Sequence, residues 1–469
     1  MDNGHITLKS AQGRWILAAT VLGSGLAMLD STVVNVALPA LGEELKAGMA
    51  GLQWTVNAYT LTLAGLILLG GSLGDRYGRR KVFLIGTVWF AIASALCGAA
   101  QNIEMLIAAR ALQGIGGALL TPGSLAIIQA SFVRGERPRA VGAWSGLGGV
   151  ASAIGPLLGG WLVQSVGWRW AFLINLPFAA LVVWVTIKHV PETRDEQATG
   201  RFDVLGAVLA ALALAGVTYG LIETGTPIPL VAGLLLGAAF VWVQVRRSPD
   251  ALVPVGIFRN HVFSAINVVT FIMYAAMGVV FFLLVVQLQV VSGFGPIAAG
   301  SAMLPVTILM LLLSSRAGEL AKRVGPRWPM TIGILVAGAA FLWMRTIGEG
   351  SSYWLHVMPS VTLFGLGLSA VVAPLTATVL ASAEERYAGT ASGVNNAVAR
   401  TGSLFAVAAI PPVVGLVGDA FKKPGVFDAG YEMAMLISAG MMVVAALITV
   451  VTIRQNVLAP DEEDETVQS

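Results

Sequence analysis

Two residues of opposite charge, Asp30 and Arg110, lie inside long apolar stretches of the sequence. A charge at the centre of a bilayer costs about 2.5–3.5 kcal/mol, so such residues face a partner or a polar path. At about 1.5 Å per helical residue, the two lie within about one turn of each other in depth. The pair therefore predicts either a carboxyl group that exchanges a proton, with its affinity modulated by Arg110, or a static ion pair that positions two helices.

Other polar residues occur at similar depths. Arg400 lies about 18 Å into its apolar segment by the same helical rise, so we expect it to face a cavity or an interface. Glu223 ends another apolar segment and is interpreted as a carboxylate at the membrane surface. Five amides are candidates either for cavity hydrogen bonds or for contacts between helices: Asn35, Gln113, Gln287, Asn395 and Asn396.

The elements that must position these residues are membrane helices. Of the 469 residues, 56% are hydrophobic and 11% are charged, and the mean hydropathy is +0.80, whereas soluble domains carry about 25% charged residues. Apolar segments long enough to cross a hydrocarbon core of about 30 Å must be helical there. We therefore predict an all-α integral membrane protein with fourteen such helices, at residues 15–39, 52–74, 81–100, 104–130, 140–164, 168–188, 204–222, 228–246, 261–291, 297–320, 327–346, 353–380, 388–417 and 431–453.

Lys and Arg are distributed unevenly between alternate loops. Of the 28, 21 fall on the side of the N-terminus and 5 on the other side, while Arg110 and Arg400 lie within helices. A missed or invented helix would scramble this parity from that point onward. Positively charged loops lie in the cytoplasm, so the bias predicts a multi-pass protein of the cell membrane with both termini cytoplasmic.

The sequence also contains an internal repeat. Residues 71–82 read GSLGDRYGRRKV, residues 318–329 read GELAKRVGPRWP, and the offset of 247 also aligns Arg139 with Arg386. We predict two homologous six-helix bundles, like the parallel repeats of transporters that rock about a central site. The predicted organisation is an N-terminal tail at 1–13, bundles at 14–190 and 251–455, a two-helix insertion at 191–250 and an acidic tail at 456–469.

Six segments in this order resemble the major facilitator superfamily, specifically its fourteen-helix drug:proton antiporter branch. They are LDSTVVNVALP at 29–39, QWTVNAY at 53–59, GSLGDRYGRRK at 71–81, RALQGIGGA at 110–118, GPLLGG at 155–160 and WRWAFLINLP at 168–177. The resemblance spans roughly residues 14–455. It implies the major-facilitator fold, with the first and fourth helices lining the N-terminal half of a central cavity.

The loop after the second predicted helix carries glycines and charges at Gly71, Asp75, Arg76, Gly78, Arg79 and Arg80. The resemblance implies a gate loop that latches the two halves together on the cytoplasmic side of the outward-open state. Asp75 would then lie at the helix N-terminus near Gly389, where negative charge is favoured. The alternative is that the arginines only anchor the loop at the cytoplasmic surface.

The fifth predicted helix carries Gly155, Pro156, Gly159 and Gly160. Small residues let helices approach closely in lipid, and a proline permits a kink. The segment therefore predicts a tight, bent contact with the opposite half, with ordinary helix packing as the alternative. In the family this segment marks antiporters, so the resemblance implies export.

Motifs for other activities are absent from the sequence. It has no GxxxxGK[ST] phosphate loop, no GxSxG motif and no His/Cys cluster with metal-ligand spacing. We expect no enzymatic activity, no cofactor, no metal and no nucleic-acid partner. The leading hypothesis is a lipid-embedded monomer that exports small amphipathic compounds, such as drugs, antibiotics or a secondary metabolite, in exchange for protons. A transporter of one narrow physiological substrate and a non-transporting membrane sensor or scaffold are the alternatives.

Overall fold

The computed structural model describes residues 6–194, 203–247, 251–384 and 387–458, so residues 1–5 of the predicted N-terminal tail and most of the predicted acidic tail lie outside the described residues. Within those ranges all fourteen predicted segments are helical, which confirms the all-α prediction. Thirteen spans are long and apolar enough to cross a membrane. The remaining segment, Ala388–Val413, is also a long helix, but it carries Asn395, Asn396 and Arg400 among its residues.

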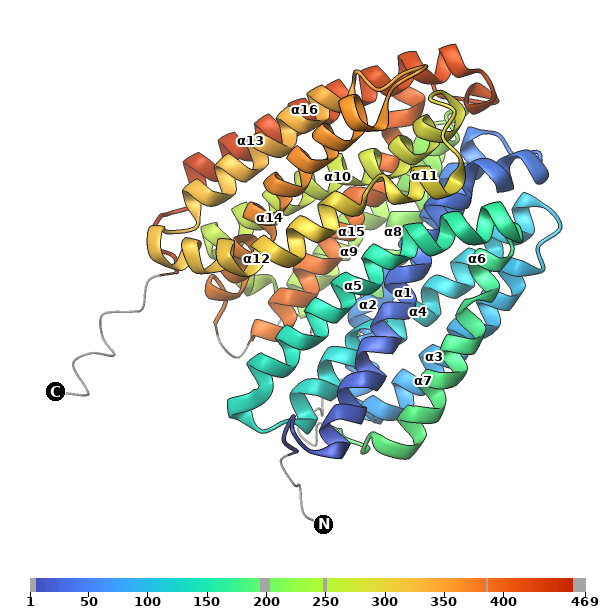
Figure 1. Cartoon of the computed structure of the whole chain (residues 1–469). Coiled ribbons are helices and arrows are strands. Elements are labelled where there is room, and N and C mark those ends of the chain that lie inside the picture. The colour runs from blue at the N-terminus through green and yellow to red at the C-terminus, as the bar shows by residue number, and fades with distance from the viewer. Residues whose placement is uncertain (1–5, 195–202, 248–250, 385–386, 459–469) are drawn as a thin grey trace.

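The first bundle is formed by the N-terminal helices, shown in blue to green in Figure 1. Within it α4 packs against α2 and α3, while α1 packs against α5 and α7. Its sixth predicted span is broken into two helices, α6 and α7, at Ile174. The helices are α1 (Ala11–Glu44), α2 (Met49–Tyr77), α3 (Arg79–Gly98), α4 (Ile103–Ser131), α5 (Arg137–Ser165), α6 (Trp170–Leu173) and α7 (Asn175–His189).

The second bundle repeats this packing. Its α14 packs against α12 and α13, and its α10 packs against α15 and α16, as their counterparts do in the first bundle. Here one predicted span is broken into α11 and α12. The helices are α10 (His261–Val290), α11 (Pro296–Ser301), α12 (Leu304–Val324), α13 (Arg327–Met344), α14 (Met358–Ala381), α15 (Ala388–Val413) and α16 (Pro424–Thr452).

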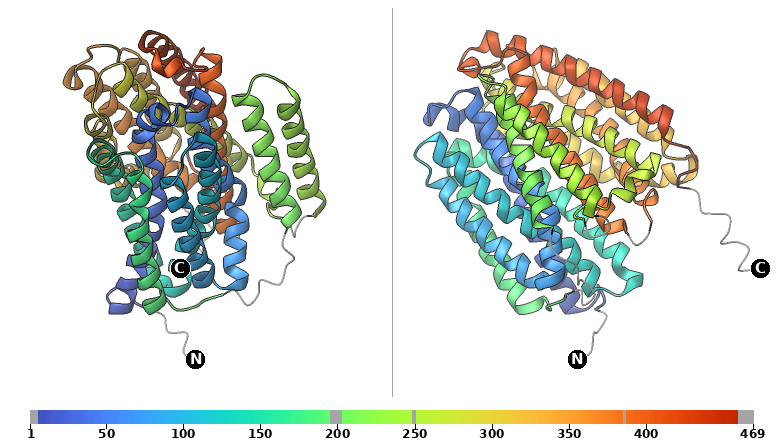
Figure 2. Two further views of the ribbon diagram at one scale, coloured as in Figure 1. Left: turned by 90° about the vertical axis from the view of Figure 1, so that its right-hand side faces the viewer. Right: turned by 180° about the vertical axis from the view of Figure 1, so that it is seen from behind.

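The two extra helices, α8 (Val204–Ile222) and α9 (Ile228–Arg247), form a hairpin beside the bundles (Figure 2). Helix α8 packs against α2 of the first bundle and α15 of the second, whereas α9 packs on α8. Asp203 caps α8 by accepting from the Gly206 amide at 2.8 Å, and it also accepts from Arg247 at 2.8 Å. This carboxylate therefore ties together the two ends of the hairpin.

The environment of Asp203 also sets its charge. Burial raises the pKa of this carboxyl group, but the hydrogen bonds from Gln244 and from the amides of Gly206 and Leu252, together with the charge of Arg247, lower it more. The pKa therefore lies below its ordinary value. The carboxylate is only 5% exposed, so it is charged and well bound at neutral pH.

The bundles meet at the end opposite the chain termini, here called the far end. There Gln53 of α2 donates to the carbonyls of Val407 and Ala408 on α15, at 2.7 and 3.0 Å. Gln289 of α10 donates to the Val36 carbonyl of α1 at 3.0 Å. In Figure 1 the two bundles converge at this end and diverge toward the ends that carry the N- and C-termini.

Candidate functional site

The predicted pair Asp30 and Arg110 forms a direct ion pair in the middle of the first bundle. Arg110 Nη1 donates to Asp30 Oδ2 at 2.6 Å. Asp30 is 0% exposed and Arg110 is 1% exposed. The carboxylate has two further donors, Gln113 Nε2 at 2.7 Å and Asn175 Nδ2 at 2.8 Å. Three helices, α1, α4 and α7, therefore supply one buried carboxylate and its three hydrogen-bond donors.

Arg110 is held in place by the backbone and by aromatic rings. Its Nε donates to the Thr55 carbonyl of α2 at 3.0 Å, and its Nη1 also donates to Gln113 Oε1 at 2.6 Å. The guanidinium carbon lies 4.4 Å from the centre of the Tyr59 ring and 5.8 Å from that of Phe172. Aromatic faces attract a desolvated cation, so the charge of Arg110 has these partners in addition to Asp30.

A second layer of polar groups orients the two amides. Gln113 and Asn175 each donate to the Ser94 hydroxyl of α3 at 2.9 Å. The Ser94 hydroxyl in turn donates to the Phe172 carbonyl at 3.1 Å. Asn175 belongs to the site, although the sequence analysis did not single it out; the available signal was a polar residue within the apolar WRWAFLINLP segment.

The sequence around Arg110 explains why these helices approach so closely. In the RALQGIGGA segment, a Cβ atom at Gly116 would lie 2.7 Å from the backbone nitrogen of Phe90 on α3. A Cβ atom at Gly114 would overlap the Thr62 hydroxyl of α2. The same nine-residue stretch thus supplies the cation, one amide and the small residues that bring α2 and α3 against it.

The second cation within a membrane-spanning helix, Arg400, lies half-buried on α15 of the other bundle. Its Nε is buried and has no hydrogen-bond partner among the described residues. The hydroxyl groups of Tyr59 on α2 and Tyr274 on α10 lie within electrostatic range of it. Tyr59 also lies within range of Asp30 and Arg110. Arg400 is therefore near the Asp30 site but belongs to the opposite side of the junction between the bundles.

The remaining predicted cavity amides lie apart from this site. Asn395 donates to Asn267 and Thr270 of α10, at 3.1 and 2.9 Å, so it joins two helices of one bundle. Exposed Asn396 donates to a carbonyl of its own helix. Both residues therefore make contacts between or within helices, and their predicted cavity role stays a prediction.

Gln287 and Asn35, which were also predicted to line a cavity, lie in two separate environments. Gln287 is fully buried near the far end of α10, where it donates to the Ile347 carbonyl and to Asp428. It is therefore a contact between helices. Asn35 is half-buried on α1, and its Oδ1 has no partner among the described residues.

The predicted gate loop contacts its own bundle and the chain that follows it. Asp75 pairs with Arg79 at 2.7 Å, one turn away. Arg80 donates to the Ile187 carbonyl at 2.9 Å, and Gly78 adopts a positive φ of 111°. Arg76 lies 6.0 Å from the Tyr77 ring. No contact of Asp75 with the start of α15 is found among the described residues, and the bundles diverge at this end.

The glycines of α5 divide between two neighbours. Gly155 packs on Thr32 and Gly159 on Val33, so both serve the contact with α1 inside the bundle. A Cβ atom at Gly160 would lie 2.5 Å from the Pro296 carbonyl oxygen of α11, and Pro156 faces Gly300 of the same helix. The contact with the opposite half therefore involves Gly160 and Pro156, whereas Gly155 and Gly159 pack within their own bundle.

Glu223, the predicted carboxylate at the membrane surface, lies at the far end of α8. The Trp54 indole donates to Glu223 Oε1 at 3.3 Å, which links the far ends of α2 and α8.

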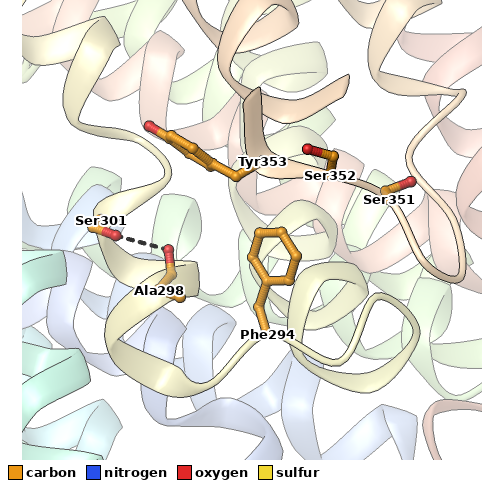
Figure 3. A pocket seen from close by; sticks show the side chains of 6 residues that line it. All are labelled: Phe294, Ala298, Ser301, Ser351, Ser352 and Tyr353. Carbon is orange, nitrogen blue, oxygen red and sulfur yellow. Dashed lines mark hydrogen bonds between the residues drawn. The ribbon is translucent and has the colours of Figure 1, made fainter. Parts of the chain in front are cut away.

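A separate pocket of about 440 Å³ lies at the far end of the second bundle, lined by Phe294, Ser301, Tyr353 and their neighbours (Figure 3). Among the described residues no group of three or more His, Cys, Asp or Glu side chains is suited to a metal ion.

Comparisons with known proteins agree with this architecture. A family model described as "Major Facilitator Superfamily" matches residues 20–407. The chain is 34% identical over 430 residues to the tetracenomycin C resistance and export protein of Streptomyces glaucescens, covering 89% of this chain and 79% of the relative. It is 32% identical over 469 residues to the puromycin resistance protein pur8 of Streptomyces alboniger, covering 96% and 93%.

Solved structures share the fold at low sequence identity. The inward-open xylose transporter XylE from E. coli superposes with a TM-score of 0.64 at 15% identity, covering 94% of this chain and 96% of that one. A POT family transporter in complex with 5-aminolevulinic acid gives 0.72 at 13% identity, covering 95% and 96%. From the family model, these relatives and the paired bundles, we conclude that the chain belongs to the major facilitator superfamily.

Proposed function

We propose that this protein exports small amphipathic organic compounds across the cytoplasmic membrane in exchange for protons, by alternating access. The single observation that carries the proposal is the Asp30 carboxylate, which is sealed from solvent and bound by Arg110, Gln113 and Asn175. A buried ionisable group in a membrane bundle marks an ion or proton pathway by default. Two relatives are named for antibiotic resistance, one of them also for export, and this supports the direction of transport.

Our mechanism assigns each part a step. Protonation of Asp30 removes the negative charge that holds Arg110, and the released cation then changes the polarity of the path between the bundles. Gly160 and Pro156 permit the close far-end contact that must open to release cargo outside. The gate loop, with Gly71, Asp75 and its arginines, would close the opposite side in that state. We assign that opposite side, with both termini, to the cytoplasm.

The energy available is sufficient for export. One proton moving through 100 mV releases about 2.3 kcal/mol. At about 1.4 kcal/mol per tenfold ratio, this sustains a substrate gradient of roughly 40-fold. No chemical reaction is required of the protein, which we propose acts as a monomer in the lipid bilayer.

A susceptibility panel tests the proposal directly. An efflux-deficient bacterial host expressing the protein should tolerate higher concentrations of some compounds in the panel, and the Asp30→Asn variant, inserted at equal level, should give no protection. Proton flux on adding each protective compound to vesicles that contain the purified protein tests the exchange. Protection that is independent of Asp30, or compound transport without proton flux, would contradict the proposed coupling.

A second candidate is a transporter dedicated to one physiological compound. Two relatives that are each named for resistance to a single antibiotic, tetracenomycin C or puromycin, favour this candidate. The same panel separates the two candidates, because protection against one compound alone supports the dedicated transporter. If no compound causes proton flux in the vesicles and no compound is transported, the protein would be a sensor or scaffold.

A further inference from the structure

The buried charges near the Asp30 site do not balance. Asp30 and Arg110 neutralise each other through a 2.6 Å ion pair. Arg400 has no carboxylate partner among the described residues, and its buried Nε has no hydrogen bond. Unlike Arg110, which is 1% exposed, Arg400 is half-buried, so its guanidinium is not sealed. The cluster therefore carries one uncompensated positive charge that remains open to a ligand.

Arg400 lies at the seam between α2 and α15, one helix from each bundle. Gln53 bonds to the carbonyl of Val407, and Leu68 contacts Gly393, so the two helices run antiparallel. This register places Arg400 opposite Thr60, about midway along both helices. A ligand bound to Arg400 would therefore lie between the bundles, where an alternating-access transporter holds its cargo.

A second orphaned polar group lies on the same seam. Asn57 is 1% exposed, and neither its Oδ1 nor its Nδ2 has a hydrogen-bond partner among the described residues. It is one helical turn from Gln53, so both side chains are on the face of α2 that meets α15. Buried polar groups without partners are rare and call for an explanation such as a missing ligand.

We infer that Arg400, with Asn57 beside it, binds the anionic group of the transported compound, so that this exporter prefers organic acids. The inference rests on the proposed function, since it names the substrate class of that path. A planar guanidinium with an unused Nε matches a carboxylate, which accepts paired hydrogen bonds. The Asn57 amide supplies a further donor one turn away. The hydroxyl groups of Tyr59 and Tyr274 lie within electrostatic range of the same guanidinium.

The charge count also disfavours the opposite class. A cationic compound between the bundles would add to the unpaired charge of Arg400, and like charges in a medium of low dielectric repel strongly. An anion instead removes the imbalance. The membrane potential, which is negative inside, also favours outward movement of an anion, so an acidic cargo is compatible with export.

Equilibrium binding to the purified full-length protein tests the inference without requiring transport. The probes are several aromatic ring systems, including naphthalene, each prepared as an acetate, an acetamide and an ethylammonium compound, with Kd measured by isothermal titration calorimetry. At least one acetate should bind about tenfold or more tightly than its acetamide, and no ethylammonium probe should bind more tightly than its acetamide. Arg400→Gln should abolish the preference for that acetate, and Arg400→Lys, which keeps the charge but loses the paired hydrogen bonds, should keep only part of it.

Arg345→Gln is the matched control, because Arg345 lies at the far end, half-exposed, with Glu432 at 3.8 Å. The ratio of acetate to acetamide affinity within each variant remains informative even when a variant folds in lower yield. A panel in which no acetate binds more tightly than its acetamide overturns the inference, as does a preference that persists in Arg400→Gln.

Other anions reach the same guanidinium, so two arms distinguish them. Chloride, and vesicles of phosphatidylglycerol, are titrated alone and as competitors of the acetate probe. Arg400-dependent binding of either one, with no Arg400-dependent binding of any acetate, would assign the site to an ion or a lipid and overturn the inference. If the wild-type protein showed no proton-driven export but still bound an acetate more tightly than its acetamide through Arg400, the proposed function alone would be refuted.

Discussion

Replacing Asp30 with Asn removes one charge from the buried site while keeping nearly the same shape. In the structure Asp30 accepts hydrogen bonds from Arg110, Gln113 and Asn175, at 2.6, 2.7 and 2.8 Å. The Asn side chain retains one acceptor oxygen, but its NH2 group would face N–H donors that it cannot hydrogen-bond. Removing one partner of a buried ion pair costs about 3–5 kcal/mol, because the remaining charge is uncompensated. We expect a loss of about 3 kcal/mol, since the remaining oxygen still serves Arg110.

A double variant separates stability from transport. Asp30→Asn with Arg110→Gln removes both charges, and a neutral pair in place of a buried ion pair is often tolerated. The double variant should therefore be more stable than Asp30→Asn alone, with an interaction energy of about 1–3 kcal/mol. Proton-driven export should nevertheless stay at least about 100-fold below wild type in both, equivalent to about 2.7 kcal/mol.

Two measurements on the same purified proteins decide between these outcomes. Unfolding followed by tryptophan fluorescence gives the stabilities, and vesicles with an imposed pH gradient give the export rates. Glu432→Gln, at the exposed far-end pair with Arg345, is the control and should change neither. Export at the wild-type rate in Asp30→Asn would refute the proton role. Additive losses of stability would show that Asp30 and Arg110 do not form the ion pair described here.

Three further predictions concern the gate loop, the far end and the hairpin. Asp75→Asn should lower stability by less than about 0.5 kcal/mol, because its pair with Arg79 is partly exposed, yet it should slow export if Asp75 latches the outward-open state; unchanged export excludes the latch. Gln53→Leu removes two bonds across the far-end contact and should increase labelling, from outside, of a cysteine introduced as Gln289→Cys; unchanged labelling means that these bonds do not hold the contact closed. Asp203→Ala should cost about 1–2 kcal/mol at pH 7. Because the pKa of Asp203 is lowered in the folded state, this difference in unfolding free energy should begin to shrink below about pH 4, the ordinary carboxyl pKa, and should be lost only below the lowered pKa of the folded state; a difference that is independent of pH would contradict the charged cap.

The sequence predicts the helices well because lipid offers the backbone no hydrogen-bond partners, so an apolar segment that crosses it must be helical. Each apolar segment must bond internally, and the alternation of Lys and Arg between loops checks the count. The breaks at Ile174 and between Ser301 and Leu304 were not predicted, although Pro177 and Pro305 follow them closely. A proline disfavours helical geometry in the residue before it, so it marks a probable boundary without fixing where the chain resumes its helix.

The sequence predicts the depth of the site residues in the membrane, but it does not predict which way their side chains point. Counting residues along two helices placed Asp30 and Arg110 at similar depths, and the structure brings them into contact. The count says nothing about how each helix is rotated, which depends on packing across the whole bundle. For this reason Asn175 was missed, while Gln287 was grouped with cavity residues although it bonds at the far end.

Every group that binds the Asp30 carboxylate belongs to one bundle. Arg110 and Gln113 come from α4, Asn175 from α7, and the supporting hydroxyl of Ser94 from α3. When that bundle tilts as a rigid unit, all of these groups move together, so no partner of the carboxylate is left behind on the other bundle. In the proposed exchange, Arg110 would release a protonated Asp30 and pair with it again without any group from the opposite half. Only the water that reaches Asp30 would then have to change sides, which would make hydration of the site the step that times proton entry.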